Sequence, residues 1–180
     1  MSLSTRQRAA AGFTLIEVMI AVLVLIIGVL GIAGMQLLSI QANQGAYFRS
    51  QAVYIGSEIL DAMRANRPAL ASYTITIDPL DLSNIPADPG CATAAAGCSP
   101  AQTAALDLRR WGAHFADVFG APDYRPTLPG GSARITSNGN LYTVQVSWVQ
   151  RGWDDTDGSD GSDLRSAITD TVQLNAVITP

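Results

Sequence analysis

The stretch Gly12-Phe13-Thr14-Leu15-Ile16-Glu17-Val18 opens the apolar run that decides how this chain is built. No residue from Val18 to Met35 is charged. At about 1.5 Å per helical residue this run is roughly 27 Å long, which matches a bilayer hydrocarbon core of about 30 Å. The run therefore predicts a helix that can span a membrane.

Glu17 lies at the start of this run, where a carboxylate needs a partner. A charge at the membrane centre costs up to about 2.5 to 3.5 kcal/mol, and less near the interface. The apolar segment contains no cation that could pair with it. Cleavage between Gly12 and Phe13 would create a new amino terminus, and two such chains packed side by side could pair amine with carboxylate. We therefore expect Glu17 to act in assembly.

A short basic leader that ends in Gly12, followed by Phe-Thr-Leu-Ile-Glu and an apolar helix, resembles the amino terminus of type IV pilins and type II secretion pseudopilins. The resemblance implies that a prepilin peptidase cuts after Gly12 and methylates Phe13. A conventional secretory signal places a shorter apolar region, of about 7 to 15 residues, before its cleavage site. A plain signal anchor would fit Arg6 and Arg8 on the cytoplasmic side, but it would not explain Glu17.

The sequence predicts three regions. Residues 1–12 form the leader peptide, residues 13–36 form a transmembrane and filament-core half of a long helix, and residues 37–180 form a periplasmic or extracellular globular domain. That domain includes the amphipathic second half of the helix, which we expect to continue to about Asn66, because the residue before Pro68 is pushed out of helical conformation. Apolar residues recur on one face of this half at Phe48, Ala52, Ile55, Ile59 and Met63.

Three glycines interrupt the apolar half at Gly28, Gly31 and Gly34, each costing about 1 kcal/mol relative to Ala in a helix. One interpretation is a helix that bends or partly melts on leaving the membrane. The other is a face of small residues that allows close helix packing. The sequence favours neither.

The rest of the chain predicts an α+β fold. Ser99-Pro100-Ala101-Gln102 reads as a capping box that opens a second helix, which apolar spacing extends to Phe119, with Gly120 ending it. Strands are predicted at Tyr73–Ile77, on both sides of the turn Ser137-Asn138-Gly139-Asn140, and at Thr171–Ile178. Three to four antiparallel strands with one apolar face would pack on the amphipathic half of the long helix.

Charge and cysteine content narrow the classes of function. All eleven basic residues are Arg. The net charge is −4, and it becomes −6 once the leader, with Arg6 and Arg8, is removed (9 minus 15). This balance argues against nucleic-acid binding, which requires a basic surface. Cys91 and Cys98 are an even pair in a segment expected outside the cytoplasm, so we predict a disulfide and no metal site there.

Two further features are weighed as sites. His114 is the only histidine. With no Ser or Cys motif beside it, a packing or surface role is favoured over catalysis, so we expect no enzyme and no cofactor. A membrane-anchored periplasmic enzyme is the remote alternative. An acidic stretch has the ligand type that calcium prefers but not the spacing of an EF-hand, so a solvated loop is favoured over a calcium site. Its carboxylates are Asp154, Asp155, Asp157, Asp160 and Asp163.

Two longer segments, Gln41 to Arg67 and Ala105 to Trp111, together with Leu128-Pro129-Gly130-Gly131 and Val146-Ser147-Trp148, resemble the PilV-type minor pilins, called type IV pilus modification proteins. The resemblance implies a subunit that sits in the inner membrane with its amino terminus in the cytoplasm and later joins an extracellular pilus. Its implied partners are other minor pilins, the major pilin and a large tip adhesin, in a complex that primes assembly for twitching motility and cell adhesion. A minor pseudopilin of type II secretion is the alternative.

Overall fold

The computed structural model describes residues 12–152 and 166–179. The chain divides into two compact units, residues 1–43 and residues 44–180. One helix, α1 (Leu15–Ala65), runs through the boundary between them.

In the second unit, α1 buries the apolar face that its sequence predicts. Ala52, Ile55, Ile59 and Met63 are buried and Phe48 is half-buried, and Gly56 and Leu60 widen the face. The helix ends at Ala65, because Asn66 leaves helical conformation (φ −118°, ψ 52°), and Pro68 lies in the first turn of the 3-10 helix that follows. Two short 3-10 turns follow, η1 (Arg67–Tyr73) and η2 (Leu82–Asn84).

Four antiparallel strands form one sheet in the order β1-β2-β3-β4, which confirms the α+β fold. The strands are β1 (Ile75–Ile77), β2 (Ser132–Asn138), β3 (Leu141–Gly152) and β4 (Ser166–Val177). The predicted hairpin joins β2 to β3, and Gly139 takes the positive φ (60°) that the first central position of a type II′ turn requires. β3 and β4 are longer than the alternating patterns indicated.

The second helix, α2 (Pro100–Gly112), begins as predicted: Ser99 Oγ accepts from the Gln102 N–H, and the Gln102 side chain accepts from the Ser99 N–H. Its predicted end at Gly120 is wrong. After Gly112, a poor helix former, the chain tightens into turns in which the Phe115 N–H donates to the Gly112 carbonyl.

These turns still bring Phe115 into the core, edge-on to Trp111 with ring centroids 5.4 Å apart. Phe119 does not follow it: its side chain is 61% exposed and stacks under Arg109 instead. Periodicity therefore predicted the core position of Phe115 correctly, and the helical conformation of this segment incorrectly.

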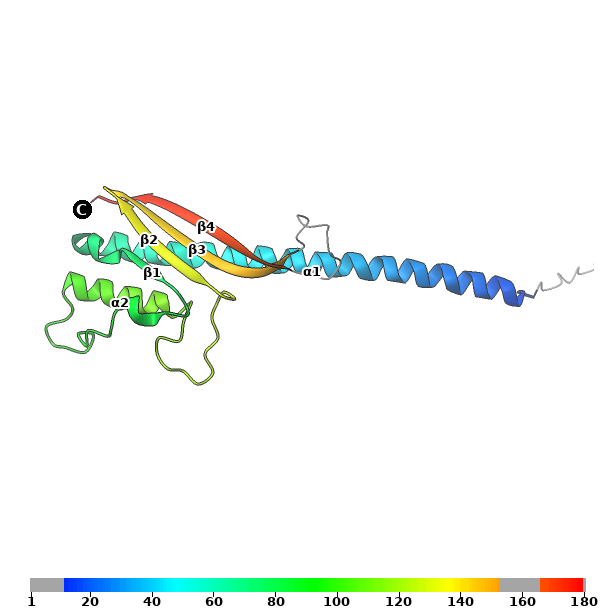
Figure 1. Cartoon of the computed structure of the whole chain (residues 1–180), viewed down its shortest axis with the longest axis horizontal. Helices are drawn as coiled ribbons and strands as arrows, with labels where there is room; N and C mark the ends of the chain where they lie inside the picture. The colour runs from blue at the N-terminus through cyan, green and yellow to red at the C-terminus, as the bar shows by residue number, and fades with distance from the viewer. Residues whose placement is uncertain (1–11, 153–165, 180) are drawn as a thin grey trace, which may run out of the picture. The chain divides into compact units, whose positions relative to one another are not determined.

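The sheet and α2 both pack on the second-unit part of α1 (Figure 1). A Cβ added at Gly56 would lie 2.4 Å from Leu174 of β4, so glycine allows this close approach. On the α2 side, the Trp111 indole N–H donates to the Ile55 carbonyl at 2.9 Å. The end of α1 is tied to α2 by Asn66, whose side-chain amide donates to the Pro100 carbonyl at 2.8 Å.

Candidate functional site

The segment around the predicted cleavage point forms the start of α1. Thr14 caps the helix: its carbonyl accepts from the N–H groups of Glu17 (3.1 Å) and Val18 (3.3 Å), and its hydroxyl accepts from the Glu17 N–H (3.3 Å). Gly12 and Phe13 precede the cap and belong to no helix or strand. Only Phe13 therefore separates the predicted cleavage point from the cap, and the cut lies outside the helix.

The apolar part of α1 is covered by nothing in its own unit. All residues from Phe13 to Ile40 are exposed, and Phe13 itself is 82% exposed. By length and composition α1 is able to cross a membrane. So large an apolar surface is stable only in lipid or against other apolar helices. This feature fits a membrane-anchored protein.

Glu17 lies in the first turn of α1, where the helix dipole favours an anion. Among the residues that the structure describes, its carboxylate has no hydrogen bond or ion pair. Phe13 lies four residues earlier, one residue before the Thr14 cap, so its amine would lie about one turn from Glu17 at the start of α1. A neighbouring helix displaced by about one turn would therefore bring the amine of one chain level with the carboxylate of the other.

Gly28, Gly31 and Gly34 lie in unbroken α-helix. A Cβ added at any of them would meet no atom of the described residues within 4 Å. Nothing inside the folded chain therefore requires glycine at these positions. The bending helix and the close-packing face both remain as interpretations.

Cys91 and Cys98 are joined by a disulfide with their Cα atoms 5.0 Å apart. The loop that it closes is also folded by its backbone: the Ala94 N–H donates to the Cys91 carbonyl and the Gly97 N–H to the Ala94 carbonyl. Gly97 has a positive φ (68°), which favours glycine. The loop is compact, and the bonded cysteines have no thiol left to bind a metal.

His114 lies between Glu58 of α1 and Thr127 in the loop before β2. Its Nε2 is 3.0 Å from the Glu58 carboxylate, and its Nδ1 is 3.2 Å from the Thr127 hydroxyl. The His114 carbonyl also accepts from the Thr127 N–H at 2.9 Å. Because two bonds tie the loop to the segment after α2, His114 has the contacts of a residue that positions a loop.

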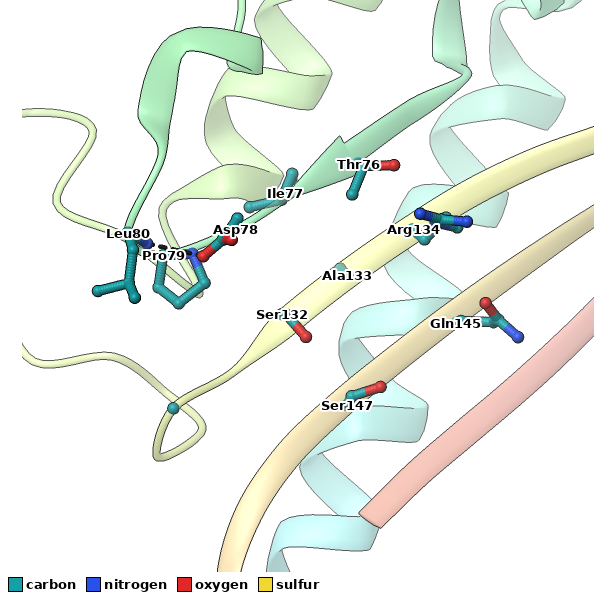
Figure 2. A pocket seen from close by; sticks show the side chains of 11 residues that line it. Thr76, Ile77, Asp78, Pro79, Leu80, Ser132, Ala133, Arg134, Gln145 and Ser147 are labelled. Carbon is teal, nitrogen blue, oxygen red and sulfur yellow. Dashed lines mark hydrogen bonds between the residues drawn. The ribbon is translucent and has the colours of Figure 1, made fainter. Parts of the chain in front are cut away.

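The outward face of the sheet carries a groove of about 560 Å³ that sequence reasoning missed (Figure 2). Arg134 of β2 and Gln145 of β3 lie directly across from each other on this face. Asp78, Pro79 and Leu80 form its other end, after β1, and Leu80 is 94% exposed. The alternating pattern placed Arg134 on the outward face, but only strand pairing shows which residues stand beside it.

The acidic residues that were weighed as a calcium site, Asp154, Asp155, Asp157, Asp160 and Asp163, lie outside the described residues. Within residues 12–152 and 166–179, no group of three or more His, Cys, Asp or Glu side chains is placed to hold a metal ion.

Two family models match the chain. One, described as the prokaryotic N-terminal methylation motif, matches residues 7–33, which contain Gly12, Phe13 and Glu17. The other, described as type IV pilin Tt1218, matches residues 34–109, from the second half of α1 into α2. Comparison with curated proteins and with solved structures gives no match. Both matches end before β2, and neither specifies the PilV type.

Proposed function

Because this chain is a type IV pilin-like protein, we propose that it is a minor pilin of the PilV type that helps to prime pilus assembly. The methylation motif implies processing by a prepilin peptidase and assembly with pilins. We place the cut between Gly12 and Phe13 and the methyl group on the new amino terminus of Phe13. Leader removal leaves Thr14 and its capping bonds intact, so α1 would not need to refold.

Glu17 is the assembly residue in this proposal. The observation that carries it is a carboxylate without a described partner, one helical turn from the new amine, at the start of an entirely exposed apolar helix. Each group alone is poorly placed in lipid, and a neighbour offset by about one turn satisfies both. Pairing between subunits would draw the processed chain from the bilayer into an assembly of parallel helices.

The second unit would then be the part displayed outside the cytoplasm. Its disulfide fits an oxidising compartment, and it has a core between α1, α2 and the sheet. Pilin family members are structural rather than catalytic, and the contacts of His114 fit that class. The resemblance to PilV-type proteins is the basis for four finer parts of the proposal. These are the minor role, the priming function, a tip position beside a large adhesin, and partnership with other minor pilins.

The processing step is tested by mass spectrometry of the chain purified from its native host. The expected amino terminus is N-methylated Phe13. An intact leader, or a start at any other residue, would remove the basis of the proposal.

The pilus role is tested by deleting the gene in the host. Deletion should abolish surface pili and twitching while secretion of exoenzymes continues. Loss of secretion with pili retained would instead support a type II secretion pseudopilin, which has the same leader and architecture.

A further inference from the structure

The two edges of the sheet differ in how they are protected. β1, at one edge, pairs over only three residues and runs into Asp78-Pro79. Short edge strands and proline are common means of blocking unwanted strand pairing. β4, at the other edge, has no charged residue, Pro or Gly from Thr171 to Val177. Its register against β3 contains no bulge. The nearest charge, Asp170, is hydrogen-bonded by Gln150.

The backbone of β4 has hydrogen-bonding groups directed away from the sheet. Just after the strand, the Ile178 N–H donates to the Asn140 carbonyl at 2.9 Å, on the β3 side. The backbone N–H and C=O groups of successive residues point to opposite sides of a strand. In β4 the groups of the even-numbered residues therefore bond to β3, and those of the odd-numbered residues point outward, away from β3 in the plane of the sheet. The residues whose backbone groups point away from β3 are Ala167, Thr169, Thr171, Gln173, Asn175 and Val177. Within the described ranges, no strand pairs with them.

An apolar border runs along the same edge. Leu174 of β4 is only half-buried above Gly56. Val53, three residues earlier on α1, lies about 60° further round the helix on the side away from Ile55, and it is 39% exposed. A strand added beside β4 would cover both side chains. The edge thus offers a backbone to pair with and apolar surface to bury.

We propose that the open edge of β4 accepts an extended segment of a different pilin subunit as a fifth strand. The proposal rests on the function proposed above, because assembly holds subunits side by side and so raises the effective concentration of such a segment. A row of outward N–H and C=O groups can pair along its whole length with another extended backbone, and these main-chain bonds supply the affinity in strand addition. Leu174 and Val53 would favour an apolar side chain at alternate positions of that segment.

The test uses the full chain in its native host. A photo-cross-linking amino acid is placed at Val177, an outward position that is 73% exposed, and at Arg134 as a control. Arg134 lies on the same face two strands away, about 10 Å from β4. The expected result is a cross-link from Val177 to a peptide of another pilin, and loss of that product when the cross-linker is at Arg134.

A substitution pair then tests the backbone itself. Gln173→Pro removes an N–H that points outward and leaves the β3–β4 bonds in place, whereas Gln173→Ala removes only the side chain. The Val177 cross-link should be lost with Gln173→Pro and kept with Gln173→Ala. A thermal melt of each purified full chain in detergent checks that Gln173→Pro still folds. If the Gln173→Pro chain does not fold, the inference is decided by comparing the Val177 and Arg134 cross-links in the otherwise unsubstituted chain.

Three results would overturn the inference: no pilin cross-link at Val177, an equal cross-link at Arg134, or a Val177 cross-link that survives Gln173→Pro. A cross-link to a second copy of this chain would also overturn it, in favour of self-association. In each case the chain could still be present in sheared pili, and the proposed function would stand. Absence of the unsubstituted chain from sheared pili would instead contradict the proposed function.

Discussion

The substitution Glu17→Val is expected to leave cleavage intact and to remove the chain from the pilus. It does not touch the Thr14 cap. Loss of an anion from the first turn costs the helix about 0.3 to 1 kcal/mol. Loss of a charge from the apolar run makes membrane insertion easier by up to about 2.5 to 3.5 kcal/mol. The processed chain should therefore accumulate in the membrane.

The assembled state is where the substitution acts. Removing one partner of a buried ion pair costs about 3 to 5 kcal/mol, because the other charge is left unpaired. Here the unpaired group would be the Phe13 amine of a neighbour. At about 1.4 kcal/mol per factor of ten, the affinity between adjacent subunits should fall by roughly two to four orders of magnitude.

The assay compares Glu17→Val and the near-isosteric Glu17→Gln with Ile16→Val, a conservative change at the adjacent exposed position. Immunoblots measure mature-size protein in membranes and in sheared pili. Both Glu17 variants should be present in membranes and depleted from pili, whereas Ile16→Val should behave as the unsubstituted chain. Recovery of Glu17→Val with sheared pili at the normal level would refute the pairing argument.

Three further outcomes are expected. Gly12→Val should leave an uncut, unassembled precursor on an immunoblot, because the predicted cut directly follows this glycine. Replacing Cys91 and Cys98 by Ala should lower the free energy of unfolding of the full chain in detergent by about 2 to 3 kcal/mol, measured by denaturant titration. Burial, with the hydrogen bond to Asp107, raises the pKa of Tyr73 well above its usual value. The neutral Tyr73 side chain therefore contributes its full stabilisation below about pH 10. Above that pH the free energy of unfolding should fall by up to about 1.4 kcal/mol per pH unit. Tyr73→Phe should therefore flatten the alkaline fall in stability.

Each of these outcomes has a result that would contradict it. A Gly12→Val chain of mature size would show cleavage without the glycine. An unchanged denaturation midpoint after loss of both cysteines would mean that the turns at Ala94 and Gly97 hold the loop unaided. For Tyr73 the control is Tyr54→Phe, at an exposed position on α1. Because the chain has no Lys, tyrosines dominate this pH range, and equal slopes for the two variants would contradict the assignment.

Local chemistry was readable from the sequence by itself. The apolar run with Glu17 at its start, the end of α1 before Pro68 and the capping box at Ser99 each depend on residues within a few positions of one another. The turn at Gly139 and Asn140 between β2 and β3 is local in the same way. The residues that favour each of these features lie within one short segment, so the pattern is enough to predict them.

Tertiary structure decided what depends on distant partners. Spacing extended the second helix to Phe119, but after Gly112 the backbone bonds tighten, and the His114 carbonyl accepts from the N–H of Thr127, a partner thirteen residues away. The groove beside Arg134 and the open edge of β4 exist because strands distant in the sequence pair in one order and leave the last strand without a neighbour on one side. Alternation predicts which face of a strand is apolar, whereas only strand order determines which backbone edge stays unpaired.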